Sequence, residues 1–149
     1  MNEEDLIETK LTLELWGDSV IDSMRNILIS NSKSASGNLI NSLNYTITYN
    51  GLDLDIDFSM PNYGDFVDKG RRPGKQQPIS AIKPWLQIKG IPEKFAFPIA
   101  RNIGKNGIKA VPFFGTTIDS KIEELTNQLT IAYTKDLDNY IQKQINKKF

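Results

Sequence analysis

The sequence of 149 residues contains no cysteine and no histidine. Without thiols there is no disulfide and no thiolate nucleophile, and without imidazole the usual general base and the commonest zinc ligand are missing. Carboxylate, lysine or serine chemistry, and oxygen-ligated Mg²⁺ or Ca²⁺, are all that remain. The composition therefore favours a protein that is not an enzyme, and we predict no catalytic residue, no metal site and no cofactor.

Long apolar runs are also missing. No stretch approaches the roughly 20 apolar residues that cross a bilayer, and the acidic start MNEEDLIETK lacks the basic region of a secretory signal. We therefore expect synthesis in the cytoplasm and no membrane contact. Hydrophobic residues make up 39% of the chain, with seven Phe, five Tyr and two Trp, which predicts a folded protein with a single domain over residues 1–149.

The net charge is zero but its distribution is uneven. Residues 1–68 hold 12 acidic and 3 basic side chains, a balance of −9, and residues 69–109 hold 1 acidic and 10 basic, a balance of +9. Residues 110–149 hold five of each sign. Blocks of opposite sign can pack together within one monomer, or can bind a neighbouring copy head to tail, which closes a ring when the rotation permits.

Hydrophobic spacing predicts an α+β fold. A long N-terminal helix over about residues 3–31 follows from apolar residues three and four apart, from Leu13 to Leu28. Two runs that alternate with polar residues flank Asn50-Gly51 and predict an antiparallel β-hairpin with a two-residue turn at that dipeptide. A small helix–turn–helix-like insert over 79–107, with Trp85, Phe95 and Phe97 as its core, precedes a long C-terminal helix.

The C-terminal helix is expected over about residues 117–147. Its apolar stripe consists of Ile118, Ile122, Leu125, Leu129, Tyr133, Leu137, Ile141 and Ile145. The polar run at 31–38 is expected to be a connection between the first helix and the hairpin.

Two patterns resemble ligand sites without their full chemistry. The alternating carboxylates Asp53, Asp55 and Asp57 lack the glycine and the glutamate of a calcium loop, and on a strand they form one solvated acidic face that could meet a basic partner. The glycine spacing from Gly70 to Gly74-Lys75 is too short for a phosphate-binding loop.

A basic loop is the most distinctive segment. YGDFVDKGRRPGKQQP, residues 63–78, changes from an aromatic, acidic turn to a loop with Lys69, Arg71, Arg72 and Lys75. Two glycines and two prolines between residues 70 and 78 predict an arm that projects from the body. We expect Tyr63, Phe66 and Val67 to be buried anchors at its base, and the four cations to bind a partner; a merely solvated loop is the alternative.

The basic middle segment also allows a different class of function. A small DNA-binding or packaging accessory protein could use residues 69–109 for phosphate affinity. The second insert helix offers few base-reading side chains beyond Arg101 and Asn102, so sequence-specific reading is not expected. A nuclease that uses Asp65 and Asp68 is a third, formal alternative.

Several motifs, in order, resemble one family. Gly37-Asn38-Leu39 with Ser42 precedes the hairpin, and Tyr63-x-x-Phe66-Val67-Asp68-x-Gly70-Arg71 precedes the Pro-rich loop. Later come Ile82-x-x-Trp85-Leu86-x-x-Lys89-Gly90, Ala100-Arg101-x-Ile103 and Gly107-Ile108-x-Ala110-x-Pro112-Phe113. Over about residues 13–145 this order resembles the head–tail joining (tail-completion, neck or connector) proteins of tailed bacteriophages. Lys69 replaces the family's aromatic residue, and the last helix is longer.

The resemblance implies a structural virion protein. Such a protein forms an oligomeric ring in the neck that joins the head and its portal to the tail, and contacts portal or adaptor and tail proteins. It also implies that the cations of the arm reach an acidic surface on a neighbouring subunit or ring, for which Asp53, Asp55 and Asp57 are candidates. The same cations could instead contact DNA non-specifically in the channel.

Overall fold

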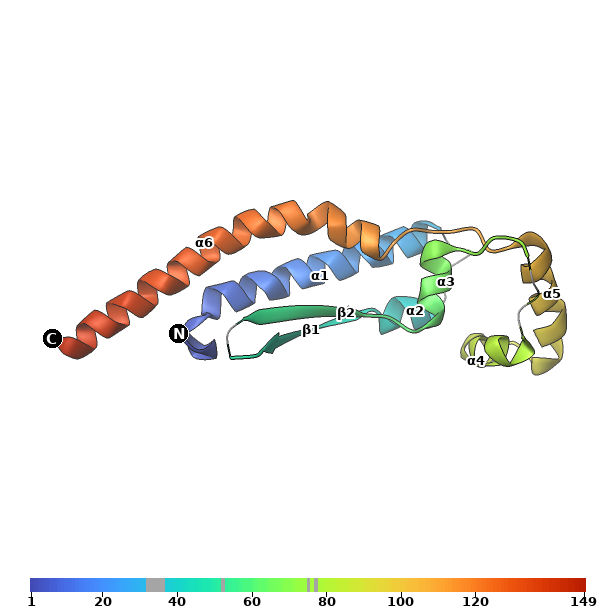
Figure 1. Cartoon of the computed structure of the whole chain (residues 1–149), viewed down its shortest axis with the longest axis horizontal. Coiled ribbons are helices and arrows are strands. Elements are labelled where there is room, and N and C mark those ends of the chain that lie inside the picture. Colours follow the sequence, from blue (N-terminus) through green and yellow to red (C-terminus); the bar gives the residue numbers. More distant parts are fainter. Residues whose placement is uncertain (32–36, 52, 75, 77) are drawn as a thin grey trace. The chain divides into compact units, whose positions relative to one another are not determined.

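The computed structural model describes residues 1–31, 37–51, 53–74, 76 and 78–149. Its elements, in chain order (Figure 1), are η1 (Glu3–Asp5), α1 (Ile7–Ser30), α2 (Gly37–Ser42), β1 (Asn44–Tyr49), β2 (Leu54–Ser59), α3 (Tyr63–Lys69), α4 (Ile79–Lys89), η2 (Glu93–Phe95), α5 (Ala96–Asn106) and α6 (Gly115–Lys148). The predicted α+β class, with two long terminal helices and a hairpin, is confirmed. Most of the predicted 31–38 connection lies outside the described residues.

The chain forms two compact units. The first, called the helical body below, comprises Met1–Ser23, Asn44–Ser59 and Thr116–Phe149; the second, called the loop unit, comprises Met24–Leu43 and Met60–Gly115. Whether the chain acts as the single domain expected from its length remains a prediction. No helix among the described residues is long and apolar enough to span a bilayer.

In the helical body, the first part of α1 packs against the hairpin and against α6. The indole of Trp16 meets the ring of Phe58 on β2, with ring centroids 5.7 Å apart, and donates a hydrogen bond to the Lys121 carbonyl on α6 at 2.9 Å. Gly17 provides the closest approach, because a Cβ there would stand 2.8–2.9 Å from the Tyr45 ring. The small size of Gly17 thus lets β1 lie close to the helix.

A carboxylate from α6 caps the beginning of α1. Leu6 accepts the first helical hydrogen bond from the Lys10 N–H, but its side chain cannot bind the free N–H groups that follow. Asp136, only 2% exposed, accepts hydrogen bonds from the N–H groups of Glu8 and Thr9 at 3.0 and 2.8 Å, and from the Thr9 hydroxyl at 2.7 Å. The end of α1 therefore gets its cap from a residue 127 positions away.

The hairpin forms, but its turn is displaced from the predicted position. Tyr49 pairs with Leu54, and the Asn50 N–H donates to the Asp53 carbonyl at 3.1 Å, so Asn50 lies opposite Asp53 and is not a central residue of the turn. Gly51 has a φ of +96°, and no described residue other than glycine has a positive φ. The side chain of Asn50 instead accepts from the Asp53 N–H and donates to Asp55. The prediction of a turn centred on Asn50-Gly51 was therefore wrong by one residue.

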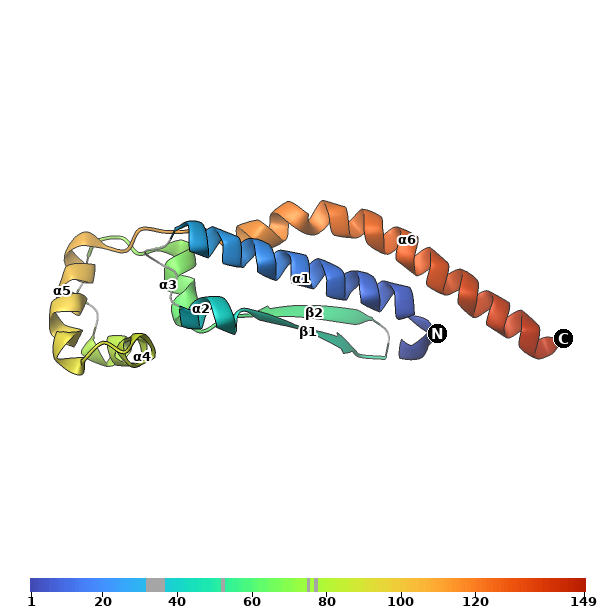
Figure 2. The same ribbon diagram turned by 180° about the vertical axis from the view of Figure 1, so that it is seen from behind.

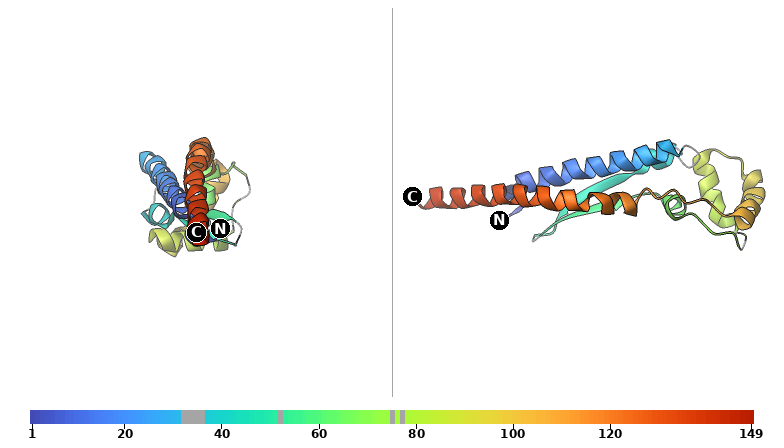
Figure 3. Two further views of the ribbon diagram at one scale, coloured as in Figure 1. Left: turned by 90° about the vertical axis from the view of Figure 1, so that its left-hand side faces the viewer. Right: turned by 90° about the horizontal axis from the view of Figure 1, so that it is seen from above.

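The apolar stripe of α6 is only partly buried. Leu125 is buried and Leu129 half-buried, whereas Tyr133, Leu137 and Ile141 are exposed. Steps of four residues advance 40° around a helix of 3.6 residues per turn, so the stripe turns away from α1. Seen from behind and from above (Figures 2 and 3), α6 runs beside the beginning of α1 and continues past the N-terminal end of the chain.

The loop unit has its own small apolar core where α4 meets α5. Ile82, Leu86, Ala96 and Ala100 are buried there, and the partly buried side chains around them are Trp85, Ile91, Ile99 and Ile103. Phe95 and Phe97 are exposed. The expected insert is thus confirmed as two short helices, but the prediction that these two phenylalanines form its core was wrong, because the small alanines of α5 face α4 instead.

Candidate functional site

The cations of the basic loop lie at the end of α3 and just after it. Lys69 ends the helix and forms an ion pair with Asp65 at 3.0 Å, with both side chains more than half exposed. Arg71 forms an isolated antiparallel bridge with Ile108: its N–H donates at 2.8 Å, and its carbonyl accepts at 2.7 Å. Arg72 is exposed. Lys75, the fourth predicted cation, lies outside the described residues.

Asp68 joins two of the sequence segments on which the resemblance rests, 63–71 and 107–113. Its Oδ1 accepts hydrogen bonds from the N–H groups of Phe113 and Phe114, both at 2.9 Å. One residue earlier, the Val67 carbonyl accepts from the Val111 N–H at 2.8 Å. Phe113 is fully buried. The carboxylate thus holds the end of α3 against the extended segment 108–114. Arg71 and Arg72 follow directly after this contact, so it fixes where their backbone begins.

Two glycines make this contact close enough. Gly70 has a φ of +66°, and a Cβ there would stand 2.5 Å from the Ile108 carbonyl oxygen and 2.6 Å from the Ala110 nitrogen. Gly107, at a φ of +72°, lies against the Arg71 carbonyl and Pro73 in the same way. Both backbone conformations and both contacts require glycine, so the family-like Gly residues have a structural role at this crossing.

The loop is less free than predicted. The Gly74 N–H donates to the Gly104 carbonyl at 2.7 Å, and a Cβ on Gly104 would stand 2.8 Å from the Gln76 Cα. Arg71 and Gly74 are therefore hydrogen-bonded to Ile108 and Gly104 of the same unit, and Gln76 lies against the end of α5. The prediction of a projecting arm is corrected to a basic edge, defined by Lys69, Arg71 and Arg72, that is tied to the loop unit.

The three expected anchors do not behave alike. Phe66 is 49% exposed, so the prediction that it is buried was wrong: it lies on the outer side of the short helix α3. Val67 is half-buried and contributes its carbonyl to the contact described above. The side chain of Tyr63 lies outside the described residues. Gly64 and Leu39, which touch across α3 and α2, and the fully buried Phe113 secure the base of the basic edge instead.

The predicted acidic face is present on the hairpin of the helical body. Asp55 and Asp57 are exposed on β2, opposite Thr48 and Thr46 of β1, while the residues between them turn inward. Asp53 is exposed in the turn before the strand. The face belongs to the helical body and the basic edge to the loop unit. Among the described residues, no group of three acidic side chains could hold a metal ion.

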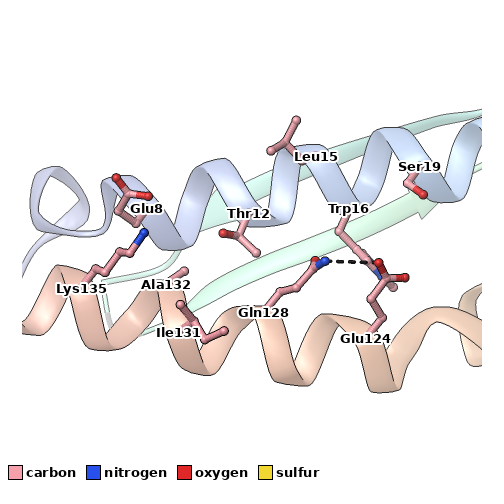
Figure 4. A pocket seen from close by; sticks show the side chains of 10 residues that line it. All are labelled: Glu8, Thr12, Leu15, Trp16, Ser19, Glu124, Gln128, Ile131, Ala132 and Lys135. Atoms are coloured by element: carbon pink, nitrogen blue, oxygen red, sulfur yellow. Dashed lines mark hydrogen bonds between the residues drawn. The ribbon is translucent and has the colours of Figure 1, made fainter.

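A groove of about 330 Å³ lies between α1 and α6 in the helical body (Figure 4). Leu15 and Trp16 on α1, and Ile131 and Ala132 on α6, are its apolar lining. Its polar lining comprises Glu8, Thr12, Ser19, Glu124, Gln128 and Lys135, with Gln128 donating to Glu124 at 3.2 Å. Sequence reasoning missed this groove.

Sequence reasoning also missed Asp136, although a signal for it exists. Positions 125, 129, 132 and 136 follow helical spacing and lie on the buried face of α6, so a carboxylate at the fourth position needs buried donors. Its partners could not be named from the pattern.

Comparisons of this chain with protein-family models, curated proteins and solved structures find no match.

Proposed function

We propose that this chain is a structural virion protein of a tailed bacteriophage that forms a ring in the neck, where it joins the head and portal to the tail. The observation that supports the proposal best is the contact of Asp68 with Phe113 and Phe114. Two of the segments that carry the resemblance, 63–71 and 107–113, are far apart in sequence, and in the fold Asp68 of the first accepts a hydrogen bond from the Phe113 N–H of the second.

The basic edge is the proposed contact with a portal, adaptor or tail protein. It combines cations on a backbone fixed by hydrogen bonds at both Arg71 and Gly74, and a fixed backbone lowers the ordering cost of binding. An acidic partner surface, such as the Asp55 and Asp57 face of a neighbouring copy, has the matching charge. Electrostatic complementarity of this kind sets the specificity and the rate of association.

The test is retention of purified portal and tail proteins by the immobilised chain. We expect the wild type to retain them at low salt and to lose them near ~1 M salt, where the screening length falls to about 3 Å. Lys69→Glu/Arg71→Glu/Arg72→Glu, which reverses the charge of the three cations of the basic edge, should abolish retention. The matched control, Arg101→Glu/Lys105→Glu/Lys109→Glu, makes the same charge change in the same unit and should retain both partners.

Two outcomes would contradict the proposal. If the first triple variant retained the portal and tail proteins as strongly as the wild type does, the basic edge would not be the contact with them. If the wild type retained only duplex DNA, and both triple variants lost it, the chain would be a DNA-binding accessory protein that uses the whole 69–109 segment.

A further inference from the structure

The helical body exposes an apolar ridge on α1. Ile7, Leu11 and Leu15 are 68%, 47% and 62% exposed, and their spacing of four residues places them in one row. Neither the hairpin nor α6 covers them, since those elements pack on Trp16, Gly17 and the buried residues beside them. Leu15 also lines the groove between α1 and α6 (Figure 4). We call these three residues the α1 ridge.

A second apolar ridge lies near the end of α6. Leu137, Ile141 and Ile145 are 37%, 44% and 46% exposed and are also four residues apart. This part of the helix continues past the start of α1 (Figure 1), and its Lys143 forms an ion pair with Asp5 at 3.2 Å. We call these three residues the α6 ridge.

The charges around the two ridges are opposite. Residues 1–23, which include the α1 ridge, hold seven acidic side chains and one basic, a balance of −6. Residues 137–149, which include the whole α6 ridge, hold three basic side chains and one acidic side chain, Asp138, a balance of +2. Two α6 ridges would therefore repel each other, as would two α1 ridges, whereas one ridge of each kind attracts.

The two ridges cannot meet within one chain. α6 is one continuous helix from Gly115 to Lys148, and its buried face already contacts the beginning of α1 through Asp136. Its exposed ridge points away from that contact, so the α1 ridge that it could cover must come from a second copy. Rows of side chains four residues apart interdigitate when two helices cross at about −50°.

We propose that the α6 ridge of one copy docks on the α1 ridge of a second copy. The contact is head to tail, so each copy offers one free ridge at each side, and copies add until a ring closes. This inference rests on the proposed function, because the expectation of a closed ring comes from that proposal, and it adds which surfaces of two copies meet. It assigns a contact between copies to the helical body, in addition to the contacts proposed for the basic edge.

Engineered disulfides test the pairing, because the chain has no cysteine of its own. A Leu11→Cys chain and an Ile141→Cys chain, given tags of different mass, are mixed and oxidised mildly. We expect the disulfide between the two different chains to be the dominant product, above either homodimer. Gln142→Cys, exposed one position away on another side of α6, is the matched control and should give little mixed disulfide.

A charge variant provides a second measurement. Lys147→Glu/Lys148→Glu should weaken self-association of the otherwise unchanged chain about fivefold in sedimentation equilibrium, by loss of two exposed attractions. Dominant Ile141→Cys homodimers would overturn the inference in favour of symmetric pairing through α6. So would a wild-type chain that stays monomeric at millimolar concentration. Neither result bears on retention of portal and tail proteins, which tests the proposed function separately.

Discussion

The buried carboxylate of Asp136 is the side chain on which the beginning of α1 depends. Asp136→Ala removes three hydrogen bonds to a charged acceptor and leaves the N–H groups of Glu8 and Thr9 without their partner. We expect the free energy of unfolding to fall by about 2–3 kcal/mol. Urea denaturation followed by circular dichroism measures it.

The controls for Asp136 separate the cap from the charge. Asp136→Asn keeps one acceptor oxygen and should lose less stability than the alanine variant. Asp138→Ala removes an exposed carboxylate two positions later and should change stability by no more than about 0.5 kcal/mol. Equal losses for Asp136→Ala and Asp138→Ala would show that the hydrogen bonds to α1 contribute nothing.

At the level of whole elements, a tyrosine links the hairpin to α1. The Tyr45 hydroxyl donates to the Asp18 carboxylate at 2.7 Å and lies 2.9 Å from the Glu14 carbonyl. Burial, followed by the hydrogen bond to Asp18, raises the pKa of Tyr45 to about 12, from an ordinary value of 10.0. The neutral phenol is therefore the form that joins the two elements.

This raised pKa predicts a loss of stability in alkaline solution. Between pH 10 and 12 the unfolded chain releases the Tyr45 proton while the folded chain retains it, so the free energy of unfolding falls as the pH rises. Tyr45→Phe removes this contribution, and its denaturation midpoint should fall less steeply over that interval than that of the wild type. Parallel pH profiles for the two proteins would assign the effect to other groups.

A second link between elements is the contact of α3 with segment 108–114. Asp68→Ala leaves two backbone N–H groups without an acceptor, which costs about 1–3 kcal/mol when such groups are shielded from water. Asp68→Asn keeps the Oδ1 acceptor and should restore most of the loss. If Asp68 positions the basic edge, the Asp68→Asn variant should also retain the portal protein better than the Asp68→Ala variant. Equal stability of the two variants would contradict the role of Oδ1.

For the molecule as a whole, local patterns predicted the two long helices, the hairpin and the helical insert, but not the short helices α2 and α3 or the distant partners of single side chains. The spacing of Leu13, Trp16 and Val20 predicts α1 because the periodicity of a helix appears in residues that are close in sequence. The hairpin was also predictable, but the register was not, because the Asn50 side chain binds its own turn. The residues around Asp136 do not indicate that Thr9 is its partner, and those around Asp68 do not indicate Phe113, because tertiary packing brings such distant partners together.

The same reasoning explains which parts of the candidate site were predicted. The cations of the basic edge and the carboxylates of the hairpin face were visible as charge patterns. The hydrogen bonds that hold the loop to Gly104 and Ile108 were not predicted. Glycine in a sequence indicates a flexible backbone, whereas these glycines allow close packing of two backbone segments. Phe66 was misplaced for a related reason: an aromatic residue in a short helix is taken as core unless the neighbouring elements are known.

The cap that Asp136 places on α1 also has a consequence for the order of events during translation. The loop unit is complete once residue 115 has been made, whereas the helical body needs the following helix of 34 residues, which takes roughly 2–7 s at ribosomal rates of 5–20 residues per second. In that interval α1 and the hairpin can pair through Tyr45 and Trp16, but the first turn of α1 has no acceptor for its N–H groups. The N–H groups of Glu8 and Thr9 therefore have no protein acceptor until residue 136 has been made, and water alone can bind them before then.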